Sequence, residues 1–313
     1  MLYLEILHTM RDKTALSGTG IAMGNATRIA ARQTINGDGA HAAYRSPRAQ
    51  RGKTRTGGGR LFFSLTLAFV LAAAAILALP RDAHAVEVGD FDIILTEGGD
   101  PTEGRDYEYS KNVLTVKTST PLTISMKSGV ASTTTDVIET AANGADVTLA
   151  GVSIDVSGNI TVAAMNVASG TLDLTLAEGT QNSLVAGSRR AGLQNNAYSL
   201  VVTGKGSLRA QGGERAAGIG SAVQGNGRNI TITGSAMVEA IGGTGAAGIG
   251  GGTSALTESE NITISGGYVK ATAGTDADAI GGGYNAQGTD GVAIAGGAFP
   301  ADAVSDGKVY GVV

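Results

Sequence analysis

The chain has 313 residues and a formal net charge of −4, with 49 Gly, no Cys, no Trp and only 4% aromatic residues. Without cysteine it can form neither a disulfide scaffold nor a Cys-based zinc site. The charge is uneven, because residues 1–85 hold 11 Lys and Arg against four Asp and Glu, whereas residues 86–313 hold 12 against 23. An acidic body with so few aromatic side chains lacks the basic surface and the stacking groups of a nucleic-acid-binding protein, so we expect no nucleic-acid partner.

An apolar stretch near the N-terminus has the features of a secretory signal. It runs from Leu61 to Leu79, follows several basic residues and precedes Pro80 and an Ala-His-Ala triplet. This pattern predicts the hydrophobic and cleavage regions of a signal peptide over residues 61–85, with cleavage after Ala85. The alternative is an uncleaved membrane anchor, since about 19 apolar residues can also span a bilayer. Both alternatives place the rest of the chain outside the cytoplasm, secreted or at the cell surface, with the membrane as a partner only through Leu61–Leu79.

Residues 1–60 are rich in Gly, Arg and Thr and have no sustained hydrophobic periodicity. They are far longer than the basic region of an ordinary signal peptide. We interpret them as a disordered basic leader, or as residues upstream of the start codon that the cell uses.

Beyond residue 140 three apolar positions recur about every 30 residues. The first opens a short alternating strand and occurs at Val147, Leu174, Leu200, Ile230, Ile262 and Val292. The second follows a small residue and occurs at Met165, Leu193, Ile219, Ile249 and Ile280. The third occurs at Leu184, Leu208, Val238, Val269 and Phe299. Three strands per repeat are the consequence.

Self-similarity at this period is typical of a solenoid, in which each unit buries its apolar face only by stacking on its neighbours. Three strands and three turns in ~30 residues make one coil of a parallel β-helix, with neighbouring coils about 4.8 Å apart. The sequence therefore predicts an all-β parallel β-helix of about six to seven coils, each with three short strands. We assign the repeats to residues 141–313, and an N-terminal cap with the first coil to residues 86–140.

Catalytic chemistry has few candidate residues after the predicted cleavage site. All three His precede it, which excludes Ser-His-Asp and Cys-His mechanisms and His-ligated metals. Two carboxylate pairs remain as candidates for a hydrolase, Asp276 with Asp278 and Glu258 with Glu260. The alternative is that these are solvated loop acids. Charged residues occupy matching positions in successive repeats, at Arg209, Glu239 and Lys270. Their side chains would line up on one outer face and stabilise neighbouring coils.

Binding chemistry is suggested by acidic and aromatic residues. Oxygen ligands for calcium are dense between residues 100 and 108, at Asp100, Glu103, Asp106 and Glu108. The alternative is a solvated acidic loop. Sugars stack on exposed aromatic rings, for which the candidates are Tyr198, Tyr268 and Tyr284. Their alternative role is packing of turns. An outward series of hydroxyl side chains at Thr148, Thr175, Thr231 and Thr263 could bind a flat polar surface, or could simply be good strand formers.

Several runs of the sequence together resemble a known family. They are VLTVKTSTPLTISMK (113–127), DVTLAGVSIDVSG (146–158), LTLAEGTQNSLVAG (174–187), AAGIG (216–220 and 246–250) and NITISGG (261–267). These segments are similar to the bacterial carbohydrate-binding β-helix domains of secreted and wall-attached adhesin-like proteins, which resemble pectate-lyase-type folds. The resemblance implies a right-handed parallel β-helix, binding of polysaccharide or of a cell-surface glycan, and in some relatives bound calcium. No residue of the chain matches a lyase centre.

The function expected from these observations is that of a non-catalytic module, secreted or at the cell surface, which binds polysaccharide or acts as an adhesin. It needs no cofactor, with calcium as the possible exception. The alternatives are a lyase or hydrolase that acts on acidic polysaccharides, and a purely structural surface stalk.

Overall fold

The computed structural model describes residues 84–298 and the backbone of residues 304 and 305. The predicted leader, the apolar stretch Leu61–Leu79 and Phe299 lie outside the described residues. Within the described part every regular element is a strand. Among these residues no helix has the length and apolar character that crossing a bilayer requires.

The strands form three sheets, which we call A, B and C. Sheet A has the order β1 (Val86–Val88), β2 (Phe91–Leu95), β5 (Leu122–Met126), β7 (Ala145–Leu149), β10 (Thr171–Leu176), β13 (Ser199–Gly204), β16 (Arg228–Ile232), β19 (Glu260–Ile264) and β22 (Val292–Ile294). Sheet B has the order β3 (Tyr107–Ser110), β4 (Val113–Val116), β6 (Val137–Thr140), β9 (Met165–Val167), β12 (Leu193–Gln194), β15 (Ile219–Gly220), β18 (Ile249–Gly250) and β21 (Ile280–Gly281). Sheet C has the order β8 (Ser153–Asp155), β11 (Gln181–Val185), β14 (Ser207–Gln211), β17 (Met237–Ile241), β20 (Tyr268–Thr272) and β23 (Val304–Ser305).

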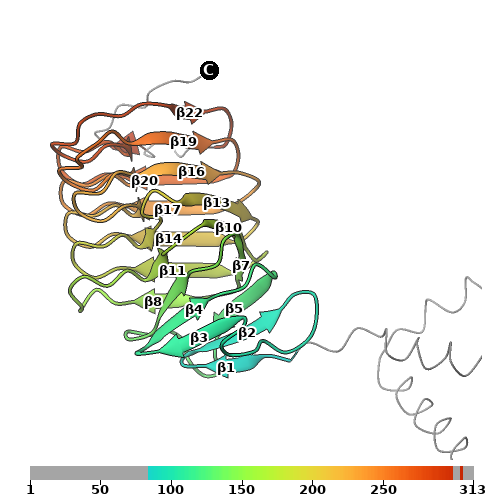
Figure 1. Ribbon diagram of the computed structural model, residues 1–313. Coiled ribbons are helices and arrows are strands. Elements are labelled where there is room, and N and C mark those ends of the chain that lie inside the picture. Colours follow the sequence, from blue (N-terminus) through green and yellow to red (C-terminus); the bar gives the residue numbers. More distant parts are fainter. Residues whose placement is uncertain (1–83, 299–303, 306–313) are drawn as a thin grey trace, which may run out of the picture. The chain divides into compact units, whose positions relative to one another are not determined.

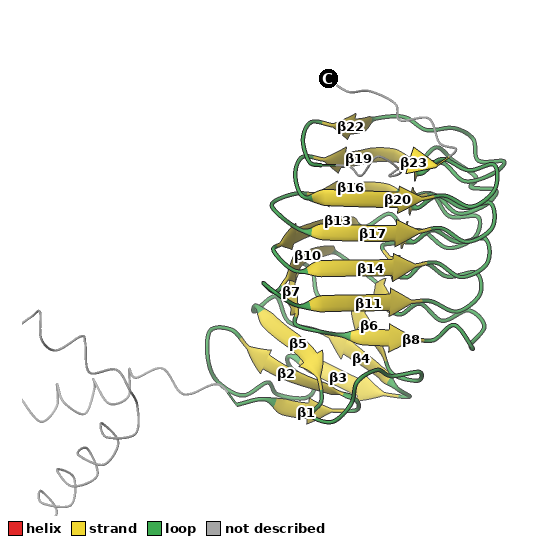
Figure 2. Ribbon diagram, turned by 180° about the vertical axis from the view of Figure 1, so that it is seen from behind, coloured by secondary structure: helices red, strands yellow, loops and turns green. Residues whose placement is uncertain are grey.

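Each coil contributes one strand to each sheet, beginning with β7, β8 and β9. Strands of successive coils pair in parallel, so the chain forms a β-solenoid of about six turns (Figure 1). Figure 2 shows the strands of sheet C stacked one above another along this solenoid. The predicted all-β fold, with three short strands per coil, is confirmed.

Inward side chains stack into apolar ladders in the interior of the solenoid. The predicted ladder of sheet B is confirmed residue for residue, because neighbouring strands pair at Met165, Leu193, Ile219, Ile249 and Ile280. Each of these side chains is at most 2% exposed. Burial of a large aliphatic side chain stabilises a fold by about 1.5–3 kcal/mol, so these ladders hold the coils together.

The predicted alignment is wrong by two residues at one step in each of the other sheets. In sheet A, Leu200 pairs with Leu172 rather than Leu174. In sheet C, Leu208 pairs with Asn182 rather than Leu184. Side chains alternate faces with a period of two, so a shift by two residues leaves the same side chains inside and the apolar pattern does not reveal it.

The register in sheet A also divides the predicted threonine series into two rows. Thr148 pairs with Thr175, which pairs with Thr203. Thr231 pairs with Thr263, but its other neighbour is Val201. The single hydroxyl row expected from the sequence is therefore not formed.

At the N-terminal end the pairing becomes antiparallel, in the hairpins β1–β2 and β3–β4. A buried carboxylate, that of Asp136, joins the two hairpins. It accepts hydrogen bonds from the Tyr109 hydroxyl at 2.8 Å, from the Asp90 backbone amide at 2.9 Å and from the Thr135 hydroxyl at 3.2 Å. Burial, and then the neighbouring Asp136 carboxylate, raises the pKa of Tyr109 to about 12.

This raised pKa predicts a loss of stability in alkaline solution. Between about pH 10 and 12 the unfolded chain ionises Tyr109 while the folded chain keeps it protonated, so the stability held at neutral pH falls across this window. In Tyr109→Phe the fall in stability should be smaller. Part of the fall should remain, because burial also raises the pKa of Tyr107. Denaturant unfolding at pH 8 and at pH 11 measures the difference. The variant Tyr198→Phe, which alters an exposed ring, should behave like the wild type, and an equal alkaline loss in Tyr109→Phe would contradict the prediction.

Candidate functional site

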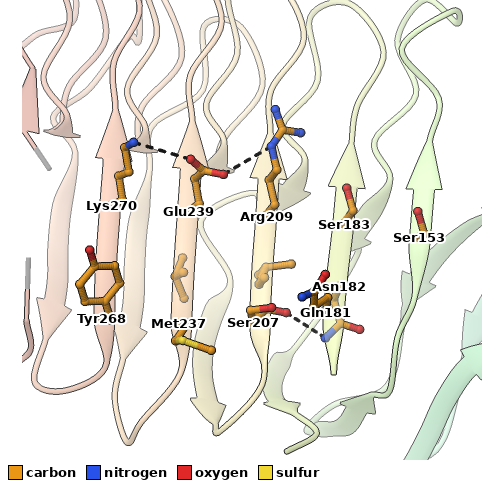
Figure 3. Close-up of a pocket in the computed structure, with 12 residues that line it drawn as sticks. Ser153, Gln181, Asn182, Ser183, Ser207, Arg209, Met237, Glu239, Tyr268 and Lys270 are labelled. Atoms are coloured by element: carbon orange, nitrogen blue, oxygen red, sulfur yellow. Dashed lines mark hydrogen bonds and ion pairs between the residues drawn. The ribbon is translucent and has the colours of Figure 1, made fainter. Parts of the chain in front are cut away.

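The outer face of sheet C carries two parallel rows of side chains that cross the coils (Figure 3). Strand pairing places the first row at Gln181, Ser207, Met237 and Tyr268. It places the second row at Ser153, Ser183, Arg209, Glu239 and Lys270. Within a row neighbours are about 4.8 Å apart, and the rows are separated by two residues, about 7 Å along each strand. The face is therefore regular and nearly periodic.

Both rows line an open groove with a volume of about 510 Å³, which we call the sheet C groove. Tyr268 and Met237 are adjacent in its first row and are 44% and 49% exposed. Two large side chains thus present apolar surface to solvent on a sheet whose inner face is already filled. Sequence reasoning found Tyr268 and missed Met237. Met237 could have been recognised in the sequence by its position, because it directly precedes the core residue Val238, just as Tyr268 directly precedes a core residue.

The second row carries the charges that the sequence predicted to line up, and this prediction is confirmed. Arg209 Nε lies 3.5 Å from one Glu239 carboxylate oxygen, and Lys270 Nζ lies 4.0 Å from the other. Arg209 also donates from Nη2 to the Gln211 side-chain oxygen at 2.7 Å. All three charged side chains are more than a third exposed, so their pairing adds little stability. The row has one more cation than anion.

One groove-lining residue, Asn182, is buried and only 2% exposed. Its side-chain oxygen accepts hydrogen bonds from the backbone amides of Gly151 and Val152, at 3.0 and 2.9 Å. Its side-chain nitrogen donates to the Ser207 carbonyl oxygen at 3.1 Å. One amide group therefore ties three successive coils together beside the groove.

A second groove, of about 500 Å³, lies over the loops that connect sheet C to sheet B and sheet B to sheet A. We call it the loop groove. It is lined by Glu214, Arg215, Thr244, Gly245, Thr253, Ser254, Thr275, Asp276, Tyr284 and Asn285. No residue lines both grooves.

The three tyrosines proposed from the sequence as sugar-stacking residues do not share one groove. Tyr268 lines the sheet C groove, and Tyr284, which is 45% exposed, lines the loop groove. Tyr198 is 39% exposed, precedes β13 and lines neither of these two grooves.

Three of the four acidic residues proposed as calcium ligands, Asp100, Asp106 and Glu108, have partners in the chain, and Glu108 lies 3.1 Å from Lys117 Nζ. Asp106 is buried and pairs with Arg105, whose Nη2 lies 2.7 Å from its carboxylate. The pKa of Asp106 is lowered, chiefly by this hydrogen bond. Asp100 accepts a hydrogen bond from the His84 backbone amide at 3.2 Å, while Glu103 is exposed. Across residues 84–298 no three His, Cys, Asp or Glu side chains are grouped to hold a metal ion. Calcium binding here stays a prediction.

Neither candidate carboxylate pair faces a groove as a pair. Asp276 lines the loop groove, whereas Asp278 accepts hydrogen bonds from Gly282 N at 3.1 Å and from the Thr289 hydroxyl at 2.9 Å. Glu260 lies 3.0 Å from Arg228, in an ion pair between coils. One carboxylate of each pair, that of Asp278 or of Glu260, is thus engaged in a hydrogen bond or ion pair within the chain.

No protein-family model, curated protein sequence or solved structure shows significant similarity to this chain. The fold therefore defines the class of protein, a β-solenoid of parallel coils.

Proposed function

We propose that this chain is a non-catalytic β-solenoid module that binds polysaccharide through the sheet C groove, as a secreted or cell-surface protein. The observation that carries the proposal is the exposed pair Tyr268 and Met237 beside a regular row of polar and charged side chains. An aromatic ring with an apolar face and a polar hydroxyl suits a sugar ring, which has apolar C–H faces and polar edges.

The shape of the groove supports a polymeric ligand. Its first row crosses four coils, which spans about 14 Å at a spacing of ~4.8 Å per coil. An open groove of this kind fits an extended linear chain better than a small molecule, because small-molecule sites bury most of their ligand's surface. The hydroxyl and amide side chains of Gln181, Ser183 and Ser207 supply hydrogen-bonding groups to sugar hydroxyls.

The test is binding of the purified full chain to a panel of soluble and insoluble polysaccharides. We expect saturable binding to at least one of them, and at least a tenfold loss of affinity in Tyr268→Ala, because truncating an aromatic side chain that anchors a ligand typically removes 1.4 kcal/mol or more. Isothermal titration and co-sedimentation with the insoluble polymers measure both effects.

The matched control is Tyr198→Ala, which removes an equally exposed tyrosine outside both grooves and should leave affinity unchanged. If a folded, β-rich chain binds no member of the panel, a structural stalk becomes the better account. New reducing or unsaturated sugar ends in the same incubations, with and without calcium, would instead identify a hydrolase or lyase.

A further inference from the structure

The loop groove differs from the sheet C groove in charge and in chemistry. Its charged lining residues are Glu214, Arg215 and Asp276, which give it a net charge of −1, whereas the sheet C groove has one excess cation. Glu214 and Asp276 are exposed, and within the described chain no ion pair or side-chain hydrogen bond engages the carboxylate of either residue. Both carboxylates are thus available to a ligand.

Tyr284 is held firmly in this groove. Its backbone amide donates to the Gly245 carbonyl oxygen at 2.8 Å, and its own carbonyl oxygen accepts from the Ser254 amide at 2.7 Å. A Cβ at Gly245 would lie 3.3 Å from the Tyr284 Cβ and 2.9 Å from the Thr253 hydroxyl, so only glycine leaves the floor of the groove open. The backbone of Tyr284 is therefore fixed before a ligand binds, and binding need not order it.

The remaining lining side chains are neutral and polar. Thr244, Thr275 and Asn285 are exposed, Ser254 is partly exposed, and none of the four uses its side chain in a hydrogen bond within the described residues. Thr253, in contrast, is buried and donates its hydroxyl to Gly245 O at 2.8 Å. Hydroxyl and amide groups that line the same groove as an exposed tyrosine match the hydroxyl-rich edge of a sugar.

We propose that the loop groove is a second binding site, separate from the sheet C groove, for a glycan that carries free primary amines, that is, an amino sugar without an N-acetyl group. A protonated amine forms charge-assisted hydrogen bonds with Glu214 and Asp276. The face of Tyr284 adds a cation–π attraction for the same group. N-acetylation removes the positive charge and with it both contacts. The site does not depend on polysaccharide binding at the sheet C groove.

The test compares glucosamine oligosaccharides with N-acetylglucosamine oligosaccharides of the same length, as ligands of the full chain at about pH 5.5, where the sugar amines are protonated. We expect the glucosamine oligosaccharides to bind at least tenfold more tightly, and added salt to weaken their binding.

The decisive variant is Asp276→Asn. Asp276 has a φ of +57°, and asparagine tolerates this left-handed conformation as well as aspartate does, so the substitution removes charge and leaves the loop intact. We expect Asp276→Asn to lower the affinity for glucosamine oligosaccharides about tenfold. Adding Glu214→Gln should lower this affinity further. The control Tyr198→Ala, which alters an exposed tyrosine that lines neither groove, should leave this affinity unchanged.

Three results would overturn the inference. The first is equal affinity for the two kinds of oligosaccharide, which includes binding of neither. The second is wild-type affinity in Asp276→Asn. The third is equally tight binding of an oligolysine peptide, which would show that the groove recognises an amine without recognising a sugar. Polysaccharide binding at the sheet C groove is tested with other ligands and with the Tyr268→Ala variant. Either proposal can therefore fail without the other.

Discussion

Replacing Gly250 with alanine is expected to lower the free energy of unfolding by about 4 kcal/mol. Gly250 has a φ of +134°, a backbone conformation that residues with a Cβ rarely adopt. A Cβ there would also collide with the carbonyl oxygen of Gly281 in the next coil. The strain cannot relax by a side-chain rotation, because both obstacles are backbone.

The position of Gly250 makes the effect spread along the solenoid. It pairs with Gly220 on one side and with Gly281 on the other, so forcing it out of place separates coils in both directions. In a solenoid stability depends on contacts between neighbouring coils, and we expect the coils C-terminal to β18 to lose their protection first. Urea unfolding followed by circular dichroism, with amide hydrogen exchange, measures both the size and the place of the loss.

Gly158 provides the matched control. It lies in an exposed turn, its φ is not in the left-handed region, and nothing lies within 4 Å of the position a Cβ would take. Gly158→Ala should therefore leave stability unchanged or raise it by up to about 1 kcal/mol, by restricting the unfolded chain. A Gly250→Ala variant as stable as Gly158→Ala would show that the sheet B corner adapts to side chains.

The repeat in the sequence was sufficient to predict the solenoid, because each coil places its apolar residues at the same three positions. The ladder of sheet B was predictable at single-residue level, since a small residue before each core residue, as in Gly218-Ile219 and Gly248-Ile249, marks the alignment. Sheets A and C lack such a marker, and at Leu200 and Leu208 the alignment was wrong by two residues. A pattern with a period of two cannot distinguish registers that differ by two.

The candidate sites were less predictable than the fold. Tyr268 and the charged row of Arg209, Glu239 and Lys270 occupy repeating strand positions, so the sequence could place them on one face. The loop groove brings Glu214, from one coil, near Tyr284, from a later coil, through loops whose stacking the strand pattern does not specify. For this reason Asp276 was considered as a catalytic partner of Asp278 rather than as a neighbour of Tyr284.

Asn182 is the clearest case in which the ladder pattern was misleading, and its replacement is the second large effect we expect. It occupies an interior ladder position next to Leu208, where the apolar pattern predicts a leucine or valine. The variants Asn182→Ala and Asn182→Leu should each lower the free energy of unfolding by about 3 kcal/mol. Both leave the amides of Gly151 and Val152 buried without their present acceptor.

The leucine variant separates two explanations of this position. If packing determined stability, Asn182→Leu would extend the ladder and match or exceed the wild type. If the hydrogen bonds determine it, as we expect, the leucine variant is as unstable as the alanine variant, and amide exchange speeds up at Gly151 and Val152. The neighbouring outward residue supplies the control, since Ser183→Ala should change stability by less than about 0.5 kcal/mol. Asn182 would then be the residue that fixes the register of sheet C, because only the observed pairing places its amide between the turn at Gly151 and the carbonyl of Ser207.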